Sequence, residues 1–173
     1  MSLTSQAASI LDAQRLKTSE LPDPGGSPQP VAFGQRGAYG AVMFLAVSDA
    51  DDWMCLLVVL ERGEDGWEDL TIVHKPWWDP QEALAEDELI ATGGHSRFSG
   101  HVCPEIVAIP GQAATETPVT RLESVKRESA PAQGPWGHFV YVACLDEPGS
   151  LVTLVAERAG AHQTVVFERL DAP

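Results

Sequence analysis

The stretch AYGAVMFLAVSDADDWMCLLVVLERGEDGWEDLTIVHKPWW, residues 38–78, contains the apolar runs that decide the fold. Each run is eight or nine residues long, is rich in Val, Leu, Ile and aromatic residues, and is bounded by turn residues; the runs cover residues 39–47, 53–60 and 67–74. The joints between them, residues 48–52 and 63–66, are short and polar, as in tight turns. The pattern predicts three consecutive antiparallel strands.

The middle run, WMCLLVVL at residues 53–60, has no polar residue on either alternation. Successive side chains of a strand point to opposite faces, so both faces of this strand should be covered by protein. The third run alternates only loosely and is expected to lie closer to solvent. The middle run is therefore the predicted core of the molecule.

The rest of the chain adds elements on both sides of this meander. Residues 4–17 favour one short helix, and residues 21–30 hold four prolines and two glycines, a composition typical of a linker. Asp79, Pro80 and Glu82 match a helix start with a capping box and predict a short helix over residues 80–90. Further strands are expected at residues 31–33, 103–109, 118–125, 136–145, 151–157 and 164–170.

These elements predict a mainly β protein, an antiparallel β-sandwich with immunoglobulin-like layers, an N-terminal helix and one short connecting helix. We expect residues 1–30 to form the helix and linker, and residues 31–173 to form a single composite sandwich domain. The alternative is an α+β arrangement in which a longer N-terminal helix lies across one curved sheet and makes a cone-like pocket. The four prolines soon after Lys17 disfavour it.

Composition restricts the class of protein and of partner. The chain has 173 residues, 44% of them hydrophobic and 21% charged, which excludes disorder over its whole length. Its net charge of −14 repels phosphate backbones and anionic lipid, so we expect neither nucleic acid nor a membrane as partner, whereas a basic protein is compatible. The N-terminus lacks a signal-peptide pattern and no run of 18 apolar residues occurs, which predicts a soluble, cytoplasmic protein.

The cysteines support the same compartment. Cys55, Cys103 and Cys144 are odd in number, and each lies within or beside an apolar strand pattern. Buried, reduced thiols are therefore expected.

One loop collects residue types that zinc prefers. His95 and His101 lie within nine residues of Cys103, and Arg97 and Phe98 lie between the two histidines. The spacing matches no standard zinc motif, so a solvated loop is favoured and no metal is expected. The loop stays a binding candidate through His95, Arg97, Phe98 and His101.

Other site patterns are weaker. Asp49, Asp51 and Asp52 cluster in one turn, but Met54 and Leu60 stand where a calcium loop needs Gly and Glu, which favours a solvated acidic turn. No G-x-S-x-G motif and no phosphate-binding glycine loop occurs. We therefore expect no catalytic residue and no cofactor.

Trp77 and Trp78 form the most informative pair. Neighbours in an extended segment face opposite ways, so at most one of the two indoles can enter the core. A partly exposed tryptophan is a good anchor for a partner protein or a sugar ring, although the more common role is to cover the edge of a sheet.

Two hypotheses for function follow. The first is a soluble non-enzymatic binding protein whose acidic surface and Trp77/Trp78 region meet a partner, such as a basic protein, as in immunity or inhibitor proteins. The second is a small metal-dependent or Cys/His-based hydrolase that uses the loop from His95 to Cys103. Bound zinc would discriminate between them. The sequence specifies neither the partner nor the oligomeric state.

Overall fold

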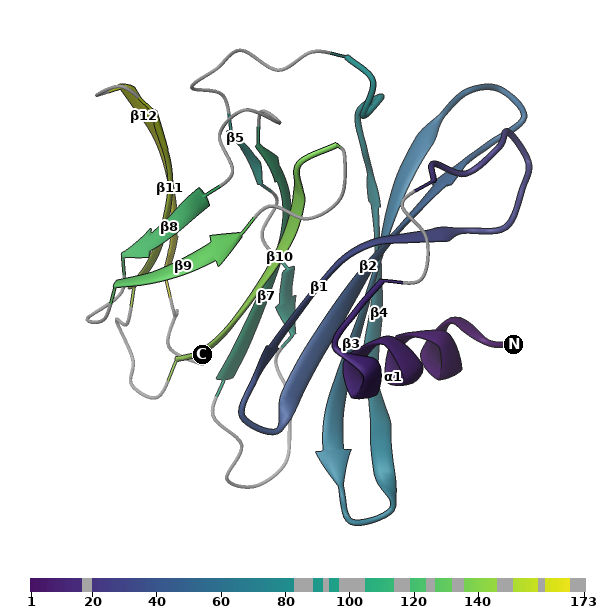
Figure 1. Cartoon of the computed structure of the whole chain (residues 1–173), viewed down its shortest axis with the longest axis horizontal. Helices are drawn as coiled ribbons and strands as arrows, with labels where there is room; N and C mark the ends of the chain where they lie inside the picture. The colour runs from purple at the N-terminus through teal and green to yellow at the C-terminus, as the bar shows by residue number, and fades with distance from the viewer. Residues whose placement is uncertain are drawn as a thin grey trace, which may run out of the picture.

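The computed structural model (Figure 1) describes the backbone of residues 1–16, 20–82, 89–91, 94–96, 105–113, 119–123, 127–131, 136–145, 151–158 and 161–168. Side-chain surroundings are described for residues 1–16, 20–82, 108–112 and 136–142. Within these ranges the elements are α1 (Leu3–Ala13), β1 (Gln29–Arg36), β2 (Tyr39–Val47), β3 (Trp53–Gly63), β4 (Gly66–Pro76), β5 (Leu89–Ala91), β6 (Gly94–Ser96), β7 (Glu105–Ala113), β8 (Val119–Glu123), β9 (Arg127–Pro131), β10 (His138–Leu145), β11 (Leu151–Arg158) and β12 (Ala161–Glu168).

The strands form three antiparallel sheets. The first has the order β1-β2-β3-β4, so the predicted meander is confirmed with one added edge strand. The second has the order β10-β7-β5, with β6 also paired to β7, and the third has the order β12-β11-β8-β9. Figure 1 shows the second sheet between the other two.

Strand β3 is buried on both faces, as its sequence predicts. Cys55, Leu57 and Val59 belong to one hydrophobic cluster, while Leu56, Val58 and Leu60 belong to a separate one. All six side chains are at most 6% exposed. This alternation divides the core of the molecule into two layers, one on each side of the first sheet.

Helix α1 covers one face of the first sheet (Figure 1). The Ser2 hydroxyl accepts a hydrogen bond from the Ser5 amide and caps the helix, and Ala7, Ile10 and Leu11 pack into the cluster on this face. A glycine permits the close approach: a Cβ at Gly40 would lie 2.5 Å from Leu11 Cδ1.

The second sheet covers the opposite face. Ala108 of β7, and Val140 and Val142 of β10, complete the cluster that holds Leu57. Strand β1 lies against β10, and a Cβ at Gly34 would lie only 2.3 Å from the Val140 carbonyl oxygen. Only a glycine at this position allows the backbones of β1 and β10 to approach this closely.

The mainly β prediction is confirmed by a four-stranded antiparallel sheet and a smaller second sheet, whereas the immunoglobulin-like sandwich stays a prediction. The connecting helix over residues 80–90 is wrong at both described ends, because Pro80 to Glu82 form a turn and residues 89–91 form β5. The predicted cap residue forms the turn: the Asp79 carboxylate accepts from the Gln81 amide, and the Glu82 amide donates to the Asp79 carbonyl. Strand β5 pairs with β7.

In the part of the chain that the structure describes, α1 is the one helix, and no helix there has the length and apolar character to cross a bilayer.

Candidate functional site: a pocket at the end of the first sheet

Three loops meet at the end of the first sheet where β2 stops and β3 begins. The Gly25 amide donates a 2.9 Å hydrogen bond to the Val47 carbonyl, which ties the segment before β1 to the last residue of β2. The Trp77 amide donates a 2.9 Å bond to the Trp53 carbonyl, which holds the segment after β4 against the first residue of β3. Segments distant in sequence are therefore fixed side by side.

The turn between β2 and β3 is held by Ser48. Its hydroxyl accepts hydrogen bonds from the amides of Ala50 and Asp52, each 3.1 Å long, and its backbone amide donates to the Asp52 carbonyl. Asp51 has a φ of 60°, in the left-handed region that Asp and Asn tolerate better than most residues. The backbone of the turn thus sets where the Asp51 carboxylate lies.

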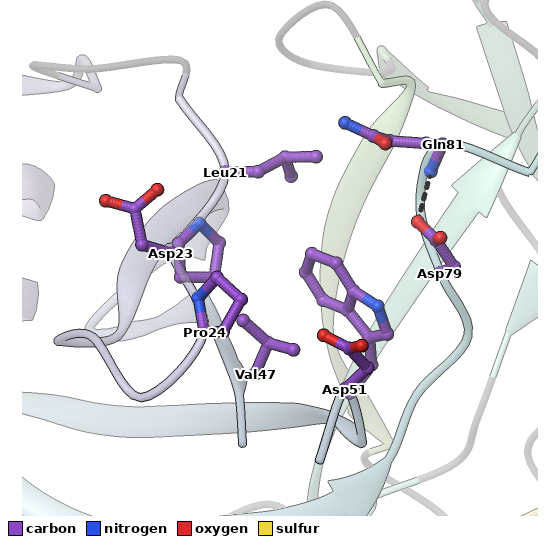
Figure 2. A pocket seen from close by; sticks show the side chains of 9 residues that line it. Leu21, Asp23, Pro24, Val47, Asp51, Asp79 and Gln81 are labelled. Atoms are coloured by element: carbon purple, nitrogen blue, oxygen red, sulfur yellow. Dashed lines mark hydrogen bonds between the residues drawn. The ribbon is translucent and has the colours of Figure 1, made fainter. Parts of the chain in front are cut away.

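The loops border a pocket of about 570 Å³ that is open to solvent; its size is within the range of about 300–1,000 Å³ usual for ligand sites. Its lining combines apolar and acidic side chains: Leu21, Pro22, Asp23, Pro24, Val47, Asp51, Trp53, Asp79 and Gln81. Figure 2 shows Leu21 and Pro24 on one side and Asp79 and Gln81 on the other, with the Asp51 carboxylate near the base. The Trp53 side chain, which also lines the pocket, packs against the core cluster and is therefore supported by it.

The charges of this pocket are all of one sign among the described residues. Asp23, Asp51 and Asp79 line it, and no described Lys or Arg does. An ion pair between Arg62 and Asp12 lies elsewhere, near the opposite end of β3. The pocket is therefore a site of negative potential with an aromatic wall, a combination that favours cationic groups.

The tryptophan pair after β4 divides as the alternation predicts. Trp77 is 7% exposed and belongs to the core cluster, whereas Trp78 is 44% exposed. The two rings meet edge to face, with centroids 5.1 Å apart and planes at 72°. The buried indole therefore supports the exposed one, and Trp78 directly precedes Asp79 of the pocket lining. Burial does not test the predicted binding role of either residue.

The other predicted binding residues lie mostly beyond the described chain. His95 is part of the short strand β6, opposite Val107 of β7. Arg97, Phe98 and His101 lie outside the described residues, as does Cys103. Among the residues described, no group of three His, Cys, Asp or Glu side chains could hold a metal ion. The hydrolase hypothesis stays a prediction, because most of its loop lies outside the described residues.

Two polar side chains, His138 and Gln112, are buried in the second sheet. His138 of β10 is 1% exposed and pairs in register with Gln112 of β7, whose Nε2 donates to the carbonyls of Pro80 and Trp136. His138 Nε2 has no hydrogen-bond partner in the described chain. Burial lowers the pKa of His138 from 6.5 to about 4, so the imidazole is neutral at pH 7.

The thiol of Cys55 lies in the core. Cys55 is buried and free, and burial raises its pKa to about 12, against the opposite effect of nearby Lys75. Its burial agrees with the expectation from sequence, while the side chain of Cys144 and all of Cys103 lie outside the description.

Sequence reasoning missed the pocket because it treated residues 21–30 only as a linker. Leu21 packs against the core cluster, Pro22 is buried, and both line the pocket. An apolar Leu-Pro pair at the start of an otherwise polar segment was the available signal.

No family model, no curated protein sequence and no solved structure matches the chain.

Proposed function

We propose that the protein is a non-enzymatic binding protein whose partner is a basic protein, and that the partner docks at the pocket end of the first sheet. The observation that carries the proposal is the exposed Trp78 beside the acidic pocket. An apolar anchor and a group of carboxylates at one end of the molecule provide the two features that such a partner needs.

The two features act on different steps of binding. The net charge of −14 attracts a basic protein at long range and speeds encounter, an effect that salt screens over about 8–10 Å. An exposed indole acts after encounter, because its burial at an interface slows dissociation. The edge-to-face contact with Trp77 restricts the Trp78 ring before binding, which reduces the entropy lost on docking.

The experiment begins with immobilised protein and an extract of the source organism at low salt, followed by kinetics with the purified partner. We expect a basic partner whose association rate falls steeply between low and physiological salt. Trp78→Ala should raise the dissociation rate about 30-fold, equivalent to about 2 kcal/mol. Met54→Ala is the comparison at the same end of the sheet: Met54 pairs with Pro76 and is another exposed apolar side chain, 38% accessible, but it is not an indole and is not part of the pocket lining.

Two results would contradict the proposal. One is the recovery of no basic partner at low salt. The other is a partner whose dissociation rate responds to Trp78→Ala no more than to Met54→Ala.

A further inference from the structure

The described part of the protein contains an internal example of how it binds a guanidinium group. The Arg62 guanidinium carbon lies 5.2 Å from the centre of the Trp67 ring, and Arg62 Nη2 lies 3.0 Å from Asp12 Oδ1. The same carboxylate oxygen accepts a 3.0 Å hydrogen bond from Trp67 Nε1. An indole and a carboxylate together hold the cation in this cluster, by cation–π attraction and by a charged hydrogen bond.

The pocket at the other end of β3 presents the same two kinds of group. Trp53 supplies the indole, and Asp51 and Asp79 supply carboxylates from two different loops. Trp53 is the first residue of β3, whereas Arg62 lies near its end, so the strand carries one cluster at each end. Among the described lining residues of the pocket, none is a cation.

We propose that the pocket binds an arginine side chain of the basic partner, with its guanidinium against the Trp53 indole and within reach of Asp51 and Asp79. This inference rests on the proposed function and adds the chemistry of the contact. A planar guanidinium can stack on a ring and donate to carboxylates from its edge, whereas a lysine ammonium is a compact point charge that cannot do both equally well. Arginine is therefore preferred over lysine.

The carboxylates differ in how they meet the pocket. Asp79 is oriented by the 2.9 Å hydrogen bond from the Gln81 amide, drawn as a dashed line in Figure 2, and Asp51 is placed by the Ser48 turn. The Asp23 carboxylate points away from Asp51 and Asp79 in the same view. Asp51 and Asp79 are consequently the pair expected to contact the guanidinium, and Asp23 adds long-range charge.

The test uses the whole chain labelled for NMR and a small probe, N-acetyl-arginine amide, at low salt. We expect the indole N–H signal of Trp53 to shift saturably. The neutral isostere N-acetyl-citrulline amide should leave it unchanged, and N-acetyl-lysine amide, blocked only at its α-amino group, should bind more weakly. Asp51→Asn and Asp79→Asn should each weaken arginine binding about fivefold, the upper range for an exposed ion pair.

Asp65→Asn is the matched control. It removes the same unit of charge from the exposed β3–β4 turn, at the opposite end of β3, roughly 30 Å away at about 3.3 Å per residue. Asp79→Asn keeps the side-chain oxygen that accepts from the Gln81 amide, and asparagine tolerates the left-handed φ of residue 51. The variants should therefore fold, which the dispersion of their NMR spectra checks directly.

Several outcomes would overturn the inference: an unmoved Trp53 signal up to the solubility limit of the probe, equal binding of citrulline or lysine compounds, or an Asp65→Asn effect as large as those of the pocket variants. The two proposals also fail separately. A partner that binds through Trp78 while the arginine probe does not bind would remove only the pocket inference. Arginine binding with no basic partner recovered would remove the proposed function and leave only the guanidinium selectivity of the pocket.

Discussion

The two faces of the first sheet are covered in different ways, as the surroundings of two glycines show. On the helix face, Gly40 makes room for the flexible end of Leu11, a side chain only 29 residues away in sequence. On the other face, Gly34 makes room for the carbonyl of Val140, a backbone group of a distant strand. A side chain can adopt another rotamer, but a carbonyl moves only if its sheet moves. The helix face should therefore tolerate added volume better than the face packed on the second sheet.

The largest expected effect comes from adding one methyl group at Gly34; the same change at Gly40 is the comparison. Gly34→Ala should destabilise the protein by about 3 kcal/mol or more, because β1 and β10 must separate to admit the Cβ. Gly40→Ala should have a smaller effect, since the Leu11 side chain can shift. Urea denaturation of both variants measures the difference. Equal losses would contradict the idea that the two faces differ in rigidity.

Truncation within β3 compares the two cores directly. Leu57 belongs to the face on the second sheet and Val58 to the face under α1, and both are at most 2% exposed. We expect Leu57→Ala and Val58→Ala each to lower the free energy of unfolding by about 2–3 kcal/mol. Chemical denaturation is the measurement. If either substitution proves neutral, that face of β3 is not part of the core.

Acid should weaken the side of the molecule that contains the second sheet. Folding lowers the pKa of His138 to about 4, so between pH 6.5 and pH 4 the unfolded chain binds a proton that the folded protein does not. Stability is therefore complete above pH 6.5 and falls as the pH decreases, by about 1.4 kcal/mol per pH unit, or about 2 kcal/mol between pH 7 and pH 5.

The control for this pH effect is His138→Gln, compared by its change in stability between pH 7 and pH 5 and not by its absolute stability. The variant should lose much less stability over this interval than the original chain. An unchanged difference would mean that other groups cause the acid sensitivity. His138 and Gln112 are the buried polar side chains in the described part of the chain, and neither lies under α1.

The smallest expected effect concerns the surface contact that joins α1 to the sheet. Asp12 accepts from Arg62 and from Trp67 Nε1, but the Asp12 and Arg62 side chains are 56% and 54% exposed. Asp12→Ala should therefore reduce stability by at most about 1 kcal/mol, and less at high salt. Thermal denaturation at two salt concentrations measures this, and a loss above that of Val58→Ala would reverse the ranking of the contacts on this face.

The parts of the fold that sequence predicted well depend on local pattern. The limits of β2, the start of β3 and the two-sided burial of β3 all follow from apolar alternation and short turns. The tryptophan pair after β4 is likewise a matter of alternation, and the structure confirms one buried and one exposed ring.

The parts that sequence missed depend on partners distant in the chain. Strand β5 pairs with β7, a partner that no local pattern near Asp79 indicates. The pocket exists because a segment rich in proline returns to the end of β2. Its prolines are compatible with this path but do not specify it. The loop from Arg97 to Cys103 lies outside the described residues, so the binding role predicted for it is untested.

The order in which the two faces are covered has a consequence during synthesis. The helix and the first four strands are complete at Pro76, but Val140 and Val142, which cover the other face, are synthesised much later. At about 5–20 residues per second, the ribosome needs roughly 3–13 s to add this intervening chain. During that interval the nascent chain exposes the apolar face that contains Leu57, a surface that chaperones recognise and that promotes aggregation at high expression. Slower initiation or a lower growth temperature should therefore raise the soluble yield of this protein.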